Sequence, residues 1–336
     1  MSLRTPLCDL LGIEHPVMLA GMGGVSYAAL CAAVSNAGGF GSLGMASVSP
    51  DGIRDEMRRV KDLTDKPFGV DLLAAIPESL TRSVDIIIAE GATAFISGLG
   101  VPSSILTALK DAGLVVIQMC GAVKHAVKGE QAGIDVVIGQ GTEGGGHTGQ
   151  VAGMALIPQM VEAVSIPVVA AGAITDGRGL AAALAMGAQG VWIGTRFIAS
   201  VEANAAMGYK QAIMEAADTD TVISRSYSGK PMRVIRNEWT ADWESRPQDL
   251  KPFGEQGRFS RDAGVMRPLL GDISDYDRSR DATAAGQGAG AVHDVLPAGE
   301  IVRQVVQEAE ETIARLSAIA SGSYRPSPRQ GRTGRQ

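Results

Sequence analysis

A single histidine, His147, stands inside a glycine-rich run at residues 140–149. An apolar run at residues 134–138 leads into it, so the run is expected to follow a buried strand. Glycine lets backbone approach a bulky planar ligand closely, and an imidazole can give or take a proton near pH 7. The pattern predicts a cofactor site with its acid or base attached. A flexible linker is the alternative, but linkers have polar, aperiodic flanks, whereas an apolar segment, 154–164, follows here.

The elements that must position this run repeat along the chain. Continuous apolar runs predict strands buried on both faces, and helical stretches ending at glycine or proline separate them. Eight β-α units in series predict an α/β fold of the (β/α)8 TIM-barrel type. An open doubly wound sheet is the alternative, but it leaves the eightfold repeat unexplained. The expected strands are Val17–Ala20, Phe40–Leu43, Phe68–Leu72, Ala94–Ser97, Leu114–Met119, Asp135–Gly139, Pro167–Ala171 and Gly190–Gly194.

The pattern changes after the eighth unit. Two β-like runs flank Ser228-Gly229-Lys230, which predicts a hairpin, and the sequence around them is charged and irregular. We expect a small cap domain over the barrel mouth, then one amphipathic helix that packs back on the barrel. The last stretch is rich in Ser, Gly, Pro and Arg and is expected to be disordered. The expected segments are the barrel at 1–216, the cap at 217–297, the C-terminal helix at 298–320 and the tail at 321–336.

Glycine-rich features fall after five of the eight expected strands, on the face where barrels of this type carry their active sites. The loops after strands seven and eight are the usual phosphate-binding pair, where backbone N–H groups and a helix N-terminus hold the anion. Any one of these glycine pairs alone is more simply a turn, but their coincidence on one face favours a ligand site. They are Gly21–Gly24, Gly98 with Gly100, residues 140–149, Gly172 with Ala173, and Gly194–Phe197.

The amino-acid composition limits the kinds of molecule that the protein is expected to bind. The chain of 336 residues is 45% hydrophobic and 20% charged, which suits a globular protein with a full-sized core. Its net charge of −6 argues against binding to nucleic acid or to an anionic membrane. Three scattered cysteines offer no metal spacing, so no metal is expected. No signal peptide and no apolar run of roughly 18–20 residues is evident, so a cytoplasmic location is expected.

The run Gln140-Gly-Thr-Glu-Gly-Gly-Gly-His147 resembles the Gln-Gly-x-Glu-Ala-Gly-Gly-His signature of the nitronate monooxygenase (2-nitropropane dioxygenase-like) flavoproteins. The resemblance extends over roughly residues 6–318. It implies a barrel that binds FMN. The same superfamily includes flavin-dependent enoyl thioester reductases, which share the signature. Further segments that resemble family motifs are Ala170–Gly177, Gly194–Phe197, Ala285–Gly288 and Pro297–Ile301.

The resemblance also implies roles for individual residues. His147 would face the substrate over the flavin as the acid or base. Asp71 departs from the family, which commonly has asparagine there, and a carboxylate near a flavin changes its electrostatics. Ala173 replaces a usual glycine, which backbone binding tolerates if the local dihedral angles are ordinary. The residues implied to bind FMN are Gly21, Met22, Gly23, Asp71, Lys124, Gln140, Gly145, Gly146, Gly172, Ala173, Gly194, Thr195 and Gln287.

Two activities remain open. The first is a nitronate monooxygenase that oxidises alkyl nitronates with O2. The alternative is an NAD(P)H-dependent enoyl-CoA or enoyl-ACP reductase, or a related acyl-CoA oxidoreductase. The basic hairpin residues Arg225, Lys230, Arg233 and Arg236 would then meet a CoA or carrier phosphate, although a solvated hairpin face is the simpler interpretation. The expected partner is therefore a small molecule, a nitronate or an acyl thioester, and the sequence is compatible with a homodimer.

Overall fold

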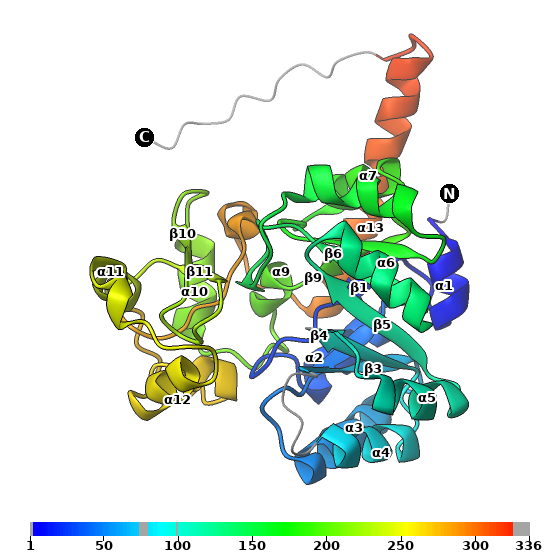
Figure 1. The fold of residues 1–336 in the computed structure, drawn as a ribbon. Helices are drawn as coiled ribbons and strands as arrows, with labels where there is room; N and C mark the ends of the chain where they lie inside the picture. The colour runs from blue at the N-terminus through cyan, green and yellow to red at the C-terminus, as the bar shows by residue number, and fades with distance from the viewer. Residues whose placement is uncertain (1–2, 74–79, 99, 325–336) are drawn as a thin grey trace.

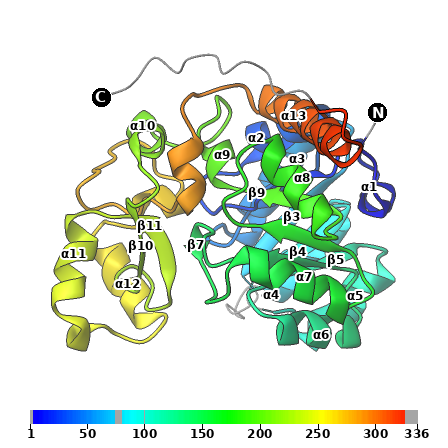
Figure 2. The ribbon, with the colours of Figure 1, turned by 90° about the horizontal axis from the view of Figure 1, so that it is seen from above.

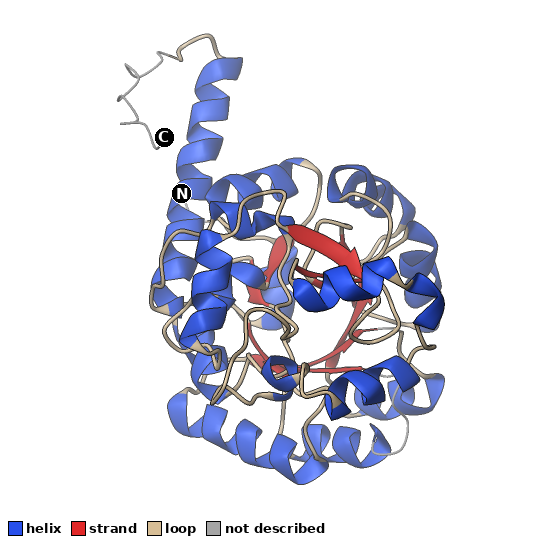
Figure 3. Ribbon diagram, turned by 90° about the vertical axis from the view of Figure 1, so that its left-hand side faces the viewer, coloured by secondary structure: helices blue, strands red, loops and turns tan. Residues whose placement is uncertain are grey.

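Eight parallel strands form a ring inside an outer layer of helices (Figures 1 and 3). The computed structural model describes residues 3–73, 80–98 and 100–324. It confirms the (β/α)8 barrel, and each of the eight expected strands is present. The strands are β1 (Val17–Leu19), β2 (Gly41–Gly44), β3 (Phe68–Leu73), β4 (Ala94–Gly98), β5 (Val115–Cys120), β6 (Val136–Gln140), β8 (Val168–Ala171) and β9 (Gly190–Ile193).

The ring closes between β1 and β2. Neighbouring strands pair in the order β1-β9-β8-β6-β5-β4-β3-β2, and a parallel bridge joins Met18 to Phe40 across the remaining gap. There the backbone N–H of Leu19 donates to Phe40 O over 2.9 Å, and Phe40 N–H donates to Val17 O over 2.9 Å. The open doubly wound sheet is therefore wrong.

The helices of the outer layer follow the strands in sequence. Glycines expected to end several of them have positive φ, for example 97° at Gly133 after α6. The part of the predicted tail at 325–336 lies outside the described residues, as does the start of the predicted helix after β3. The helices are α2 (Ala28–Asn36), α3 (Pro50–Leu63), α4 (Leu80–Ala89), α5 (Ser103–Asp111), α6 (Val123–Ala132), α7 (Gly153–Ala163), α8 (Gly177–Ala185), α9 (Thr195–Ile198) and α10 (Met207–Glu215).

One end of the barrel is filled by a short helix, α1 (Pro6–Leu11). Leu7 and Leu11 are fully buried and belong to the same apolar cluster as the inward-facing Phe40 and Trp192. Burying a leucine is worth about 1.5–3 kcal/mol, so this end is a packed core. A ligand can therefore reach the interior only from the carboxyl ends of the strands, as expected for this fold.

The segment after α10 forms a separate layer beside the barrel mouth (Figures 1 and 2). The expected hairpin is present as β10 (Thr221–Ser224) and β11 (Met232–Ile235). Tyr227, Val234 and Val265 belong to a small apolar core of this segment. Its remaining elements are α11 (Glu238–Ser245), α12 (Glu255–Asp262) and the short 3-10 turns Pro247–Asp249, Arg267–Leu270 and Gln287–Ala291.

The glycine-rich run is part of that layer as well as of the barrel. Gly146 and His147 form a two-residue strand, β7, which pairs antiparallel with β11. Met232 lies opposite His147, and Arg233 lies opposite Gly146. Figure 2 shows β7 between the barrel and the hairpin. The glycine-rich run therefore connects the barrel to the segment after α10 through the pairing of β7 with β11.

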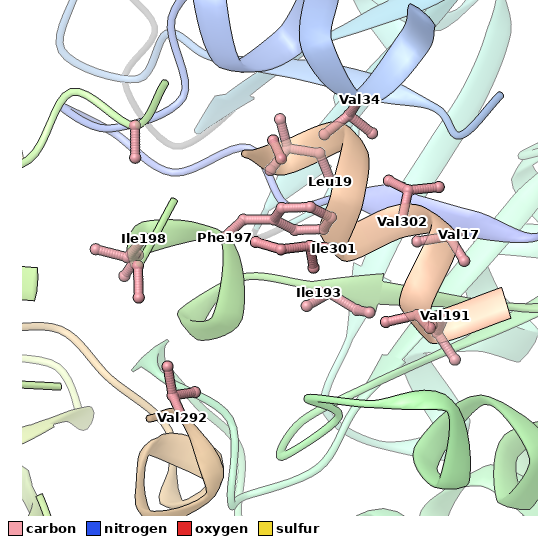
Figure 4. Packing of buried hydrophobic residues seen from close by; sticks show 14 of the residues in the cluster. Val17, Leu19, Val34, Val191, Ile193, Phe197, Ile198, Val292, Ile301 and Val302 are labelled. Atoms are coloured by element: carbon pink, nitrogen blue, oxygen red, sulfur yellow. The ribbon is translucent and has the colours of Figure 1, made fainter. Parts of the chain in front are cut away.

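The C-terminal helix α13 (Ala298–Ala320) packs against α8 and α2. Figure 4 shows its Ile301 beside Phe197 and Leu19. At Gly177 the helix backbone comes so close that an added Cβ would lie 2.2 Å from the backbone N of Ala309. Among the described residues, no helix is long and apolar enough to span a bilayer.

We expect Gly177→Ala to lower the free energy of unfolding by about 1–3 kcal/mol, because a methyl group there must push α13 away from α8. It would also strain the hydrogen bond from Gly177 N–H to Glu308 Oε2, now 2.9 Å. Urea unfolding measures the change. Gly257→Ala, in α12, is the matched control because its added methyl meets nothing within 4 Å. Equal stability of the two variants would contradict the close packing.

Candidate functional site

A cavity of about 1040 Å³ opens at the carboxyl ends of the barrel strands and is closed on one side by the cap. All but one of the residues predicted to form the site line it. The exception is Gln287, whose side chain is exposed while its backbone N–H donates to Glu143 O over 3.0 Å. The lining residues that were predicted are Gly21, Met22, Gly23, Asp71, Lys124, Gln140, Gly145, Gly146, His147, Gly172, Ala173, Gly194 and Thr195.

Residues of both the barrel and the cap form hydrogen bonds with His147. From the barrel, the Gln140 side-chain amide donates to His147 O over 2.9 Å. From the cap, Ser228 Oγ lies 2.8 Å from His147 Nε2 and shares a hydrogen bond with it. Ser228 is itself buried. The orientation of the imidazole is thus set by a residue 81 positions away in the chain.

The surroundings of His147 keep it neutral. Burial, and then the nearby Lys230 ammonium, lower its pKa from 6.5 to about 4. The expectation of an imidazole that exchanges protons near pH 7 therefore needs correction. At pH 7 the ring is the neutral imidazole, in which one nitrogen carries N–H and can donate a hydrogen bond while the other can accept a hydrogen bond or a proton; the imidazolium, the stronger acid, is not the resting form.

Lys230 reaches the cavity beside this histidine. Its ammonium lies 4.1 Å from the centroid of the Phe253 ring. The same ring meets His147 edge-on, with centroids 6.3 Å apart. A cation held over an aromatic face keeps its charge while losing part of its hydration. The cap thus places one positive charge at the cavity wall.

The basic hairpin residues do not form one solvated face. Arg233 is buried, and its Nε and Nη2 both donate to Thr142 O over 3.0 Å. It therefore ties the hairpin to the glycine-rich run. Arg225 and Arg236 are exposed, as the simpler interpretation expected. Of the four hairpin residues, Lys230 alone lines the cavity.

The two loops that were expected to hold a phosphate follow β8 and β9, and their structure differs from expectation in two respects. Ala173 has φ 53°, the one positive φ among the described residues other than glycine, so its dihedral angles are not ordinary. The N-terminus of α8 is already satisfied. Asp176 Oδ1 accepts from two of its N–H groups, and Glu308 Oε2 accepts from Gly177. An anion here would depend on the loop backbone itself.

Several glycines line the cavity, and at some of them neighbouring backbone leaves no room for a side chain. A Cβ on Gly145 would lie 2.7 Å from the carbonyl carbon of Ala285. Gly286 N–H donates to Thr195 Oγ1 over 3.0 Å. A Cβ on Gly194 would touch Met22 Sδ at 3.4 Å. Such a glycine cradle, beside the loops after β8 and β9, fits a planar ring that carries a phosphate.

Asp71 lies within β3, two residues before the last residue of the strand, Leu73. Its neighbours Val70 and Leu72 pack outward, so Asp71 points into the barrel, as strand alternation requires. Its side chain touches Gly21, where an added Cβ would lie 2.5 Å from Asp71 Oδ2. Burial raises its pKa well above the usual range.

Sequence reasoning gave no site role to Ser228 or Phe253. Ser228 was visible only as the first residue of a hairpin turn. Phe253 belongs to an irregular segment without periodicity. Neither pattern carries information about a contact with a loop more than 80 residues earlier, since that contact arises from tertiary packing.

Fold and cavity together define a barrel enzyme with a ligand site between its loops and a cap. A family model described as nitronate monooxygenase matches residues 4–82 and 73–308. The chain therefore belongs to the nitronate monooxygenase family. Members of this family are in general flavin-dependent oxidoreductases, and this protein is an enzyme of the oxidoreductase class.

Individual relatives carry different names. The chain is 37% identical to a (3aS,4S,5R,7aS)-5-hydroxy-7a-methyl-1-oxo-octahydro-1H-indene-4-carboxyl-CoA dehydrogenase of Mycobacterium tuberculosis, over 95% of this chain and 99% of that protein. It is 35% identical to a probable nitronate monooxygenase of Staphylococcus saprophyticus, over 77% and 86%. The solved structure of FabK from Thermotoga maritima is similar, with a TM-score of 0.86, 35% identity and coverage of 94% and 99%.

Lys230→Met is expected to raise the pKa of His147 above about 4, because it removes one of the two causes of the lowering. The value should stay below 6.5, since burial is the larger cause. NMR titration of the imidazole measures it, with His147→Gln to assign the signal among four histidines. Lys128→Met is the control, because Lys128 also lines the cavity but is not among the causes of the lowered His147 pKa. An unchanged His147 pKa in Lys230→Met would contradict the proximity of this charge.

Ala173→Gly should stabilise the fold by up to about 1 kcal/mol, because glycine adopts positive φ without the steric cost that alanine carries. Thermal unfolding of the apoprotein measures the effect. Ala171→Gly, in β8 two residues earlier, should instead be destabilising by about 1 kcal/mol. Destabilisation by both variants alike would show that residue 173 is not strained.

Proposed function

We propose that this protein is an FMN-dependent oxidoreductase of acyl-CoA-type thioesters, interconverting the saturated and the 2,3-unsaturated acyl group. The main observation that supports this proposal is the volume of the cavity. Its volume of about 1040 Å³ stands at the upper end of the range of ligand pockets. It leaves room for a bulky acyl group beside a planar cofactor. The M. tuberculosis relative, named as a carboxyl-CoA dehydrogenase, supports this substrate class.

The cavity also extends to a basic rim. Lys124, His125 and Lys128 of α6 are exposed side chains that line it. Their location suits the phosphates of a CoA tail, which can stay partly solvated while the acyl group enters the interior. Arg225 and Arg236, which the sequence had offered for this task, are exposed on the hairpin and do not line the cavity.

The glycine cradle and the backbone of Gly172, Ala173, Gly194 and Thr195 would hold FMN. Bound there, FMN would supply the chemistry of hydride transfer for the acyl β-carbon. The remaining chemistry is loss or gain of the α-proton, which a side chain must handle. His147, neutral at pH 7, is the candidate to accept it.

Ser228 and Lys230 would support that proton transfer. Ser228 engages His147 Nε2 and so fixes the ring orientation. The Lys230 ammonium would stabilise negative charge that develops on the thioester oxygen when the α-proton leaves. Apolar cap side chains such as Met232, Met266 and Leu269 line the opposite wall and would exclude water from the reacting atoms.

Nitronate oxidation is the second candidate. The S. saprophyticus relative carries that name. A cation next to a neutral histidine is also a suitable site for a small nitronate anion. This activity would need O2 and no nicotinamide, whereas an enoyl reductase would use NAD(P)H.

Anaerobic mixing separates these activities. The protein is loaded with FMN and mixed in turn with a saturated cyclic acyl-CoA, with NADPH followed by an enoyl-CoA, and with propyl nitronate, while flavin absorbance is followed. We expect bleaching by the acyl-CoA, or reoxidation of the NADPH-reduced flavin by the enoyl-CoA. His147→Gln should slow that step by roughly 10²–10⁴-fold while keeping the flavin bound.

The opposite results are equally informative. Bleaching by nitronate alone would establish the second candidate and reject the thioester proposal. A protein that never takes up FMN would reject both. Full activity of His147→Gln would remove His147 from the proton transfer.

A further inference from the structure

The ligand cavity continues outside the ring of strands. Val116 and Cys120 of β5 belong to an apolar cluster that also contains residues of α5 and α6, whereas Ile117 packs inside the barrel. Side chains alternate along a strand, so Gln118 points outward like Val116 and Cys120. Gln118 and Cys120 nevertheless line the cavity. The cavity therefore extends from the barrel mouth onto the outer side of β5.

Helix α6 forms one wall of this extension. His125, Lys128 and Ala132 recur at intervals of three and four residues, so they share one face of the helix, and all three are exposed and line the cavity. Ile134, just after the helix, is buried and lines it as well. From Lys124 to Ala132 the helix rises by about 12 Å. The extension is thus an elongated groove along α6 that opens to solvent, and we call it the α6 groove.

The side-chain amide of Gln118 leaves one atom available in the α6 groove. The residue is 9% exposed. Its Nε2 donates to His125 O over 3.3 Å and to Cys120 Sγ over 3.4 Å, whereas no described residue donates to its Oε1. Gly129 lies beside that oxygen, since an added Cβ would be 3.2 Å from it. Buried polar groups are almost always hydrogen-bonded, so a bound molecule with an N–H group is a suitable partner for Oε1.

The lining of the α6 groove suits a chain that alternates amides with apolar segments. Gln118 offers a hydrogen-bond acceptor, and Ala132 and Ile134 offer apolar contacts. Lys124 and Lys128 are exposed at its solvent side. The pantetheine arm of a CoA thioester has amide N–H groups separated by apolar carbon segments, and it ends at phosphates. A nicotinamide dinucleotide also carries phosphates, but a ribose, rather than an amide chain, separates them from its reacting ring.

We propose that the α6 groove binds the pantetheine arm of the acyl thioester, with an amide N–H of the arm donating to Gln118 Oε1 and the CoA phosphates beside Lys124 and Lys128. This inference rests on the proposed thioester activity. It makes the tail of the substrate leave the barrel mouth beside β5, and not between the barrel and the cap hairpin, where Lys230 lies.

Ala132→Trp tests the far part of the groove. A truncated N-acetylcysteamine thioester carries the acyl group but lacks most of the arm, so it does not need that part. The ratio of kcat/KM for acyl-CoA to kcat/KM for the truncated thioester should fall by about tenfold or more in Ala132→Trp. Gln131→Trp is the matched control, because Gln131 is an exposed neighbour on α6 that does not line the cavity. Circular dichroism confirms that both variants are folded.

Gln118→Leu tests the amide contact. It should raise the KM for acyl-pantetheine by up to about tenfold with little change in kcat, because the lost acceptor serves ground state and transition state alike. A merely structural role, through the bond to His125 O, would lower kcat or the melting temperature instead. Lys128→Met should raise the KM for acyl-CoA more than that for acyl-pantetheine, which has no nucleotide phosphates. Calorimetric titration with CoA alone measures the same losses of affinity without turnover.

These results separate the inference from the proposed function. Equal substrate ratios in Ala132→Trp and Gln131→Trp would overturn the inference and leave the thioester activity in place. A raised KM for NADPH, with the KM for acyl-CoA unchanged, would assign the groove to a nicotinamide dinucleotide and overturn it as well. Failure of the wild type to turn over any of the thioesters would overturn both.

Discussion

The two-residue pairing of β7 with β11 is the contact on which the site depends. Gly146 and His147 are the whole of β7, and their partners Met232 and Arg233 come from the cap hairpin. Without this pairing the glycine-rich run would be a mobile loop, because glycine loses more backbone freedom on folding than any other residue. The pairing brings Ser228 to His147 and Lys230 to the cavity wall. It therefore joins the glycine-rich side of the cavity, which belongs to the barrel, to the side formed by the cap.

A second constraint is the low polarity of the site. Two titratable groups, His147 and Asp71, face one cavity and are both shifted toward their uncharged forms by burial. Burial thus disfavours the charged form of both side chains in this part of the cavity. The one cation that the cap adds, Lys230, meets no carboxylate partner within salt-bridge distance among the described residues.

Segments that are distant in the sequence pack closely at their glycines and together form one side of the cavity. The residues at 285–288 press against both the glycine-rich run and the loop after β9. The carboxylates of Asp176 and Glu308 accept hydrogen bonds from the N–H groups at the α8 N-terminus. A ligand would therefore bind to the backbone of the loop before α8. The strained residue Ala173 lies in that loop, and strained backbone of this kind is often retained at binding sites.

Sequence by itself predicted the barrel, because eight β-α units of similar length in series are typical of a closed ring, and the bridge between Met18 and Phe40 then decided against the open sheet. It also located the floor of the site, since loops that follow parallel strands must share one face. It placed thirteen of the predicted site residues around one cavity, and Gln287 alone falls outside it. Local pattern was sufficient there because strand alternation and loop position are local properties.

Tertiary structure alone decided what those residues can do. The contact of Ser228 with His147 spans 81 positions, and no periodicity encodes it. Arg233 reads as a surface residue in sequence, yet it is buried because Thr142 O lies within its reach. The charge states of His147 and Asp71 depend on how much water and how many charges surround them. That environment is assembled by segments far apart in the chain, so it exists only once the barrel and the cap have come together.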